Sequence, residues 1–597
     1  MLRTSMWLAI TLAMTSCSRK PPPPPPPAPP GDAAVAPAPD KSAALYADPK
    51  HIIDPVNGTY VGSGKTYMVV SESSLASLVG KDVLSKGGNA VDAAIAVHFA
   101  LAVVHPTAGN VGGGGFAVIR TAPGKATTLD FREVAPAAAT EAMYLDDKGN
   151  PTNASITGHK ASGVPGAVAG MWALHKKYGK RPWAELVTPS VALARDGFEA
   201  DAYLATALAR ASTKKRMLAS AATAKLWYPN GEPVVAGTKV TIPELAVVLE
   251  RIAAKGPDGF YKGETAAAIV DEMRRGGGII TAKDLESYTP VWREPLKFTY
   301  RGNAVTSMPP PSSGGIALAM TAGMLADVDL GKLPWHGKEH VHRLAEVWRR
   351  AFAARNELIG DPKFVKSIPI EKLLSPAYHA ELAKTITDKA TPSKDVAPLR
   401  EGSNTTNFCV VDAAGMAVVI TTTLNTSFGS GVTVEKGGFL LNNEMDDFTA
   451  KPGSPNIFGL VQGVANKIEP GKRPLSSMSP TIVEDAKGNV LLLVGAAGGP
   501  RIITAVWQTL SNVIDFKQPV AYAVANPRVH HQHLPDLLNL EAGSVERGVE
   551  KALIDAGHKT DWSENKREFG AVNAITKTQA GFDGAADPRG GGAAVGD

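Results

Sequence analysis

Cysteine is scarce in this sequence: only Cys17 and Cys409 occur in 597 residues. A disulfide-stapled scaffold is therefore excluded. Cys17 falls in a segment with the pattern of an export signal, so the domain that follows keeps a single thiol and cannot form an internal disulfide. Cys409 lies in the apolar run 408–411, which favours a buried, unreactive thiol over a nucleophile.

Concentrated charge and long apolar runs are also missing. The chain carries 62 Lys and Arg against 57 Asp and Glu, and the net charge of +5 is small for this length. A nucleic-acid-binding protein needs a dense basic face, so we expect no nucleic-acid partner. No apolar run reaches membrane-spanning length. Hydrophobic residues nonetheless make up 44% of the chain, which predicts an ordinary globular core.

The N-terminus has the pattern of a secretory signal. Arg3 gives a positive start, 6–14 is a short apolar stretch, and Thr15-Ser16 places small residues before Cys17. Small residues directly before a cysteine also resemble a bacterial lipobox, although Met14 stands where leucine is usual. We expect lipidation at Cys17; a plain signal peptide with an incidental cysteine is the alternative.

A proline-rich segment follows the signal. Pro21–Pro27 and Pro29-Pro30 favour an extended polyproline II spacer, which fits a tether that holds a globular domain off a membrane. A recognition site for an SH3-like partner is the alternative. We divide the start of the chain into a signal peptide with a lipobox (1–17) and a linker (18–55). These features predict an exported protein, on the periplasmic side or at the outer membrane of a Gram-negative bacterium.

The globular region shows a long helix early and hairpins late. Asn89–Val104 is an Ala-rich pattern typical of a buried helix, with Asp92 near its N-terminus. The second half contains two hairpin patterns. These are 408–411 with 416–423, and 480–484 with 490–494. The second hairpin leads through Gly498-Gly499 into a helix opened by Pro500. Hairpins followed by helices favour an α/β layer fold with an antiparallel sheet.

The chemistry centres on Thr405, which precedes the first late strand. A threonine hydroxyl needs a base, and a threonine that begins a chain can use its own α-amine. That amine titrates at about 7.7–8.0, close to working pH. It must first be freed by cutting the Asn404–Thr405 bond, which the hydroxyl can do by attacking the preceding carbonyl. Taken alone, the run Asn404-Thr405-Thr406 favours a capping or turn segment.

The motifs around Thr405 closely resemble γ-glutamyltransferases. Their order along the chain is the family's order, and they span nearly everything after the linker. On the side of the small subunit they are 404–406, 423–429, 441–448, 472–478 and 584–589, and on the side of the large subunit 108–116, 129–133 and the turn at Pro309. The resemblance implies an N-terminal nucleophile hydrolase, an α/β protein folded as a four-layer αββα sandwich. It also implies a large subunit (56–404) and a small catalytic subunit (405–597), which stay together as a heterodimer after self-cleavage.

The family's catalytic roles transfer position by position. The resemblance implies that Thr405 is the nucleophile for both autoprocessing and catalysis, with Thr423 as a hydroxyl beside it. Gly498 and Gly499 correspond to the pair whose backbone N–H groups form the oxyanion hole. Glycines at a helix N-terminus suit that role, because they present unpaired donors to a developing negative charge. Without the other motifs, an ordinary strand-to-helix turn is the better interpretation of Gly-Gly.

The substrate-binding roles transfer in the same way. Arg132, Ser476 and Ser477 correspond to the clamp for the substrate α-carboxylate, since a guanidinium fork suits a planar carboxylate. Asn425, Glu444 and Asp447 correspond to the ammonium pocket. Without the resemblance, the acidic pair also fits a solvated turn or a calcium loop. We expect no metal and no cofactor, although His530, His531 and His533 superficially resemble a metal cluster.

Two positions depart from the family pattern. Phe458, in a segment 451–460 that resembles a lid loop, stands where lid-bearing relatives often have tyrosine, so a hydroxyl contact is lost. Asn407 stands where relatives commonly have histidine, which bears on the rate of processing.

The expected function is transfer of the γ-glutamyl group of glutathione and related amides, through a Thr405 ester, to water or to amino acid and dipeptide acceptors. A cephalosporin (glutaryl) acylase is the nearest alternative, but it has less need for Glu444 and Asp447 as an ammonium pocket. A non-catalytic surface lipoprotein that stays uncleaved and only binds peptides is the alternative from another class.

Overall fold

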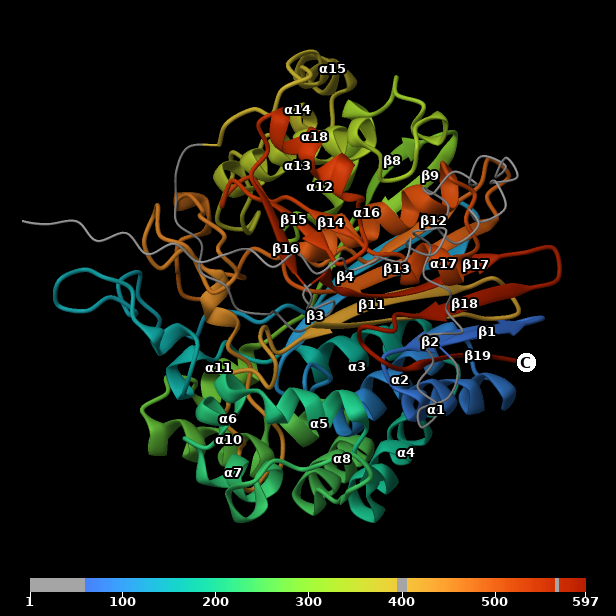
Figure 1. The fold of residues 1–597 in the computed structure, drawn as a ribbon. Coiled ribbons are helices and arrows are strands. Elements are labelled where there is room, and N and C mark those ends of the chain that lie inside the picture. Colours follow the sequence, from blue (N-terminus) through green and yellow to red (C-terminus); the bar gives the residue numbers. More distant parts are fainter. Residues whose placement is uncertain (1–59, 394–404, 564–568) are drawn as a thin grey trace, which may run out of the picture. The chain divides into compact units, whose positions relative to one another are not determined.

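The computed structural model describes residues 60–393, 405–563 and 569–597 (Figure 1). Two seven-stranded sheets form its centre, and every pair of neighbouring strands in them is antiparallel. In spatial order, the first sheet contains β1 (Val61–Gly64), β18 (Phe582–Ala586), β17 (Ala571–Lys577), β13 (Val490–Ala497), β12 (Thr481–Glu484), β9 (Asn303–Ser307) and β8 (Leu296–Tyr300). The second contains β19 (Ala593–Gly596), β2 (Met68–Ser71), β10 (Thr405–Val411), β11 (Ala417–Thr423), β3 (Gly114–Ala122), β4 (Lys125–Asp130) and β7 (Val291–Arg293).

Helices cover the outer face of each sheet, and the inner faces pack against each other (Figure 1). The helices against the second sheet are α1 (Ser74–Ser85), α2 (Ala90–Val104) and α3 (Ala167–Tyr178), and those against the first are α12 (Gly314–Met324), α16 (Arg501–Ile514) and α17 (Val520–Ala525). This arrangement confirms the predicted αββα sandwich. Cys409 lies fully buried in the core between the sheets, where burial raises the pKa of its thiol, as expected for an unreactive side chain.

Both predicted hairpins are present. The first begins earlier than its apolar pattern suggested, because β10 starts at Thr405 rather than Phe408. All seven residues of β10 are buried. The polar residues 405–407 can occupy a buried strand because the neighbouring β11 pairs with the backbone of each of them.

The predicted helix at Asn89–Val104 is also confirmed, as α2. Asn89 is its N-cap: its side chain accepts a hydrogen bond from Asp92 N at 2.9 Å, and Asp92 Oδ2 accepts one from Asn89 N at 3.0 Å. Asp92 therefore stabilises the helix start through a reciprocal capping box as well as through the helix dipole. Within the described residues, no helix combines the length and the apolar character that crossing a membrane requires.

The segments before and after residue 404 share both sheets. In the second sheet, β10 and β11 lie between β2 and β3, and β19 lies on the far side of β2. In the first sheet, β12, β13, β17 and β18 lie between β1 and β9. Neither segment therefore has a complete sheet of its own.

His98 gives the fold a pH-dependent weak point. It is fully buried on α2 beside Phe131 and Phe408, and burial lowers its pKa to about 4. The unfolded chain takes up this proton near pH 6.5, whereas the folded protein does not. His98 therefore costs stability as the pH falls from 7 to 5. We expect His98→Phe to stabilise the protein by about 2 kcal/mol more at pH 5 than at pH 7. Denaturation curves at both pH values test this, and an equal effect at both would contradict it.

Candidate active site

Thr405 and Thr423 lie opposite each other at the ends of two paired strands. Thr405 begins β10, Thr423 ends β11, and the strand register places them as direct partners. Their hydroxyl oxygens are 3.3 Å apart, and both residues are buried. Asn425 N–H donates to Thr423 Oγ1 at 2.8 Å, so Thr423 can direct its own hydrogen towards Thr405 Oγ1. A hydrogen bond in that direction leaves the Thr405 hydroxyl proton available to a base.

One cavity gathers the residues that the sequence pointed to. All the predicted site residues that the structure describes, except Gly498, line it. They are Arg132, Thr405, Thr423, Asn425, Glu444, Asp447, Ser476, Ser477 and Gly499. The predicted cleavage residue Asn404 and the predicted lipidation residue Cys17 lie outside the described residues. Residues more than 300 positions apart in the chain thus come to one place.

Gly498 and Gly499 form the turn between β13 and α16. Their φ angles are 128° and 56°, in the region that favours glycine. A Cβ atom on Gly498 would lie 2.8 Å from Gly570 Cα, so a larger residue does not fit. Pro500 is the N-cap and α16 begins at Arg501, one residue later than predicted. Gly499 therefore lines the cavity at the N-terminal end of a helix, which is the end that favours negative charge.

Arg132 lies among three carboxylates. It donates to Glu444 and Asp447, and Glu133 Oε2 lies 3.8 Å from its Nη1. Burial works to lower the pKa of Arg132, but Glu444 and Asp447 outweigh this and raise it. Burial raises the pKa of Glu133 to about 7 and that of Glu444 well above its usual value, against the pull of Arg132. Three acidic groups thus surround one guanidinium, and those of them that are ionised attract an incoming cation.

Two residues of this site have no counterpart in the sequence argument. Glu133 belongs to the motif 129–133, but the motif assigns it no role. Arg355, at the end of α13 (Lys338–Leu358), was not noted at all, although it is 2% exposed and lines the cavity. No local pattern reveals Arg355, because its helix is otherwise an ordinary amphipathic one. Only the fold shows that its side chain reaches the same cavity as Arg132.

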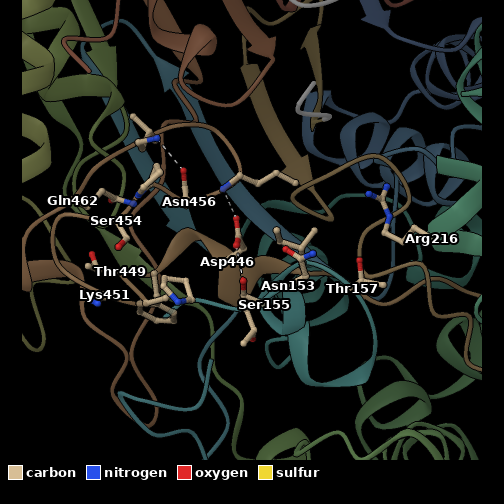
Figure 2. A pocket seen from close by; sticks show the side chains of 18 of the residues that line it. Asn153, Ser155, Thr157, Arg216, Asp446, Thr449, Lys451, Ser454, Asn456 and Gln462 are labelled. Carbon is tan, nitrogen blue, oxygen red and sulfur yellow. Dashed lines mark hydrogen bonds between the residues drawn. The ribbon is translucent and has the colours of Figure 1, made fainter. Parts of the chain in front are cut away.

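Segment 451–460, the predicted lid, lies between two cavities. One is the cavity lined by Thr405, which we call the catalytic cavity, and the other is larger, with a volume of about 660 Å³. Leu460 lines both cavities. Phe458 lines the catalytic cavity, so an apolar ring stands at the position where the sequence predicts the loss of a hydroxyl contact. In Figure 2, Asp446, Ser155 and Asn456 surround the larger cavity. The short helix η7 (Glu444–Asp447) therefore places Glu444 and Asp447 in one cavity and Asp446 in the other.

Asp446 ties the lid to the rest of the molecule. Its carboxylate accepts hydrogen bonds from Ile457 N at 3.0 Å and from Ser155 Oγ at 2.7 Å (Figure 2). Burial raises its pKa to about 6, so above pH 6 it is an ionised, strong acceptor. A hydrogen bond to a charged group contributes about 1.5–3 kcal/mol. If the lid helps to hold the substrate, Asp446→Ala should raise the KM for the expected γ-glutamyl substrate roughly 10-fold.

Steady-state kinetics tests this prediction. Ser155→Ala removes only one of the two bonds and should have a smaller effect in the same direction. The difference between Asp446→Ala and the unmodified protein should shrink as the pH falls from 7 to 5, because Asp446 is then protonated. An unchanged KM at pH 7 would exclude Asp446 as the tether.

Asn407 and the histidines at 530 and 531 have neighbours in the structure that explain them. Asn407 donates from Nδ2 to Ala571 O at 3.2 Å, and its main-chain carbonyl oxygen accepts from Asn573 Nδ2 at 2.7 Å. It therefore joins β10 to the facing sheet. His530 Nδ1 is hydrogen-bonded to Thr504 Oγ1 at 2.8 Å, and His531 Nε2 lies 3.4 Å from Asp536 Oδ1. No group of three or more His, Cys, Asp or Glu side chains in the described part of the chain has the geometry to hold a metal ion.

Comparison with known proteins supports the resemblance. The family model for gamma-glutamyltranspeptidase matches residues 76–597. The chain belongs to the gamma-glutamyltranspeptidase family. It is 45% identical over 565 residues to the glutathione hydrolase proenzyme of Escherichia coli (strain K12), covering 93% of this chain and 94% of that protein. It is 37% identical to the proenzyme of the same name from Bacillus subtilis (strain 168), covering 90% and 92%.

Solved structures of this family and of related hydrolases share the fold. The cephalosporin acylase from Bacillus halodurans superposes with a TM-score of 0.78 at 26% identity, over 90% of this chain and 97% of that one. A chain of the Helicobacter pylori gamma-glutamyltranspeptidase gives a TM-score of 0.54 at 41% identity, over 58% of this chain and 97% of that one. The fold is therefore common to proteins with two different activities in their names, and the side chains of the site must decide between them.

Proposed function

We propose that this gamma-glutamyltranspeptidase-family protein is a self-cleaving glutathione hydrolase and γ-glutamyltransferase. The observation that carries the proposal is the placement of Thr405 in one cavity with Arg132, Glu444 and Asp447. A buried hydroxyl nucleophile and a charged site for an α-amino acid head group thus face the same space. The high identity to glutathione hydrolase proenzymes over nearly the whole chain supports the same activity.

Self-cleavage is the first step. Thr405 Oγ1 attacks the carbonyl carbon of Asn404, the C–N bond breaks, and the acyl group moves from nitrogen to oxygen as an ester. Water then hydrolyses the ester, which releases the carboxylate of Asn404 and frees both the hydroxyl and the α-amine of Thr405. Thr423, 3.3 Å from the attacking oxygen, holds that oxygen in place.

Transfer uses the same hydroxyl. The freed amine accepts the hydroxyl proton, and Thr405 Oγ1 attacks the γ-carbonyl carbon of the donor. The backbone N–H groups of Gly498 and Gly499 stabilise the oxyanion, and the amine returns the proton to the departing nitrogen. Water or the amine of an acceptor then attacks the Thr405 ester, giving glutamate or a new γ-glutamyl compound.

The head group of the donor replaces contacts that the site makes with itself. Arg132 bonds to Glu444 and Asp447. The substrate ammonium adds the positive charge that these carboxylates lack, while the α-carboxylate binds at Arg132 with Ser476 and Ser477. Asn425 also lines this end of the cavity, and its Nδ2 donates to Asn443 O at 2.9 Å. A zwitterion is thus accommodated without leaving a buried charge unpaired.

A glutaryl acylase is the competing activity, since a cephalosporin acylase shares the fold. A glutaryl group lacks the ammonium, so it brings no cation to Glu444 and Asp447, which line the same cavity as Thr405. Steady-state rates on γ-glutamyl and glutaryl anilides separate the two activities. We expect the γ-glutamyl anilide to be strongly preferred, and a preference for the glutaryl anilide would overturn the proposal.

We further propose that the protein is made as a zymogen, is exported and is anchored through a lipid on Cys17. This rests on the order of the signal, the cysteine and the proline-rich linker in the sequence. The two fragments of the precursor would remain together as a heterodimer. Mass spectrometry of the intact purified protein reports both the cut at Asn404–Thr405 and the mass of a lipid, and an unmodified Cys17 in the mature protein would exclude the anchor.

A further inference from the structure

The buried guanidinium of Arg355 contacts only neutral oxygens. It donates from Nε to Ser313 Oγ at 3.1 Å, from Nη2 to Ser477 Oγ at 3.1 Å, and from Nη1 to Asn356 Oδ1 at 3.0 Å and Gln462 Oε1 at 3.3 Å. Among the described residues, no ion pair within 4.0 Å joins it to a carboxylate, and Asp447 attracts it only from a greater distance. Arg132, in the same cavity, bonds to two carboxylates. The positive charge of Arg355 is therefore the less compensated of the two.

The bond to Ser477 fixes the direction of the serine hydroxyl. A guanidinium can only donate hydrogen bonds, so Ser477 Oγ must accept from Arg355. The hydrogen of the Ser477 hydroxyl then points away from Arg355. Because Ser477 lines the catalytic cavity, that hydrogen is available to an acceptor there. A carboxylate, which only accepts, is the matching ligand.

The neighbouring Ser476 is held in a similar way. Its Oγ accepts from Met478 N at 3.1 Å, which leaves its own hydrogen to donate. Its backbone carbonyl accepts from Ser313 Oγ at 2.7 Å, and Ser313 Oγ accepts in turn from Arg355 Nε. Arg355 thus supports Ser477 directly and Ser476 through Ser313, and both serines face the cavity as donors.

We propose that Arg355 is a positioning and specificity-determining residue for the α-carboxylate of the substrate. It presets Ser476 and Ser477 as hydrogen-bond donors, and its charge favours an anion beside them. This role rests on the proposed function and assigns to α13 a part in recognition that the sequence motifs do not show. Arg355 acts through the serines, so it is not itself a catalytic residue. Burial lowers its pKa to about 10, yet it stays cationic at working pH.

The test compares two donors that differ only in the α-carboxylate: a γ-glutamyl anilide and a 4-aminobutyryl anilide. In Arg355→Gln, kcat/KM for the γ-glutamyl anilide should fall about 100-fold, mainly through KM, since a charge-assisted donor to the serine pair is lost. For the 4-aminobutyryl anilide, kcat/KM should fall less than about 3-fold, because that substrate has no α-carboxylate for the two serines to bind. Arg355→Lys should recover part of the preference, because it keeps a cationic donor.

Three further variants make the result specific. In a Ser477→Ala background, Arg355→Gln should have a smaller effect than in the unmodified protein, because part of its action runs through that hydroxyl. Ser313→Ala removes only the link from Arg355 through Ser313 to Ser476. It should shift the donor preference in the same direction as Arg355→Gln, but by less. Arg350→Gln is the control, since it makes the same substitution on the same helix. Arg350 bonds to Glu346 and Thr385 and to neither serine, so this variant should leave the donor preference unchanged.

Each outcome decides the role of Arg355. An equal loss on both donors in Arg355→Gln would make the residue merely structural and overturn the proposal. If Arg355→Gln does not fold, an unchanged donor preference in both Arg355→Lys and Ser313→Ala would overturn it as well. An unmodified protein that is inactive on the γ-glutamyl anilide would instead contradict the proposed function. A denaturing gel of each variant shows whether processing has occurred.

Discussion

Replacing Thr405 with alanine is expected to leave the protein as one uncleaved chain with no measurable transferase or hydrolase activity. The substitution removes the only atom that can attack either the Asn404 carbonyl or the substrate in the proposed mechanism. Loss of a hydroxyl nucleophile of this kind typically reduces kcat by at least about 10⁴-fold. Denaturing gels and anilide hydrolysis measure the two effects. The fold should persist, because β10 pairs with β11 and β2 through its backbone, which the substitution leaves unchanged.

Thr405→Ser is the matched control. It keeps the hydroxyl and should give two fragments and a reduced but measurable rate. Edman sequencing of the smaller fragment should begin at residue 405. An active protein whose backbone is continuous across 404–405 would refute the proposed mechanism, since the α-amine of Thr405 would then not exist.

Replacing Arg132 with methionine is expected to have the second-largest effect. It leaves Glu133, Glu444 and Asp447 buried without the guanidinium that holds them. Breaking a buried ion pair by removing one partner costs about 3–5 kcal/mol of stability, unless the carboxylates take up protons. Because the α-carboxylate also loses its charged partner, kcat/KM for the γ-glutamyl anilide should fall by about 10³-fold or more.

Arg120→Met separates the two consequences. Arg120, on β3, pairs with Glu484 on β12 at 2.7 Å, so it joins the two sheets at a buried position outside the catalytic cavity. Its replacement should lower the thermal midpoint as Arg132→Met does, with kcat/KM little changed. If both variants reduced kcat/KM alike, the effect of Arg132→Met would be one of stability rather than of binding.

The sequence predicts the fold and most of the site because the signals are local. The hairpin around 412–415, the helix after Pro500 and the motifs containing Thr405 and Glu444 are all contiguous patterns. Their meeting in one cavity follows from the family resemblance, and the antiparallel register of β10 and β11 explains it physically, since it places the ends of both strands together.

Other features depend on contacts that no contiguous pattern encodes. Arg355 reaches the cavity only because α13 packs beside the segment that carries Ser476 and Ser477. The pairing of Arg132 with Glu444 and Asp447 is another such contact: the sequence motifs indicate a carboxylate clamp and an ammonium pocket as separate sites, whereas the structure joins them by hydrogen bonds. Likewise, the opposite orientations of Asp446 and Asp447 depend on the local backbone of η7.

The mixed origin of the sheet strands should keep the two pieces of the proposed processed enzyme together. Five pairs of neighbouring strands join a strand from before residue 404 to one from after it: β10 and β19 with β2, β11 with β3, β18 with β1, and β12 with β9. The two pieces therefore cannot come apart without breaking all five ladders of backbone bonds. Specific activity should therefore be independent of dilution. Differently labelled molecules mixed after processing should not trade pieces, and each nicked molecule should keep its original pair of chains for as long as it stays folded.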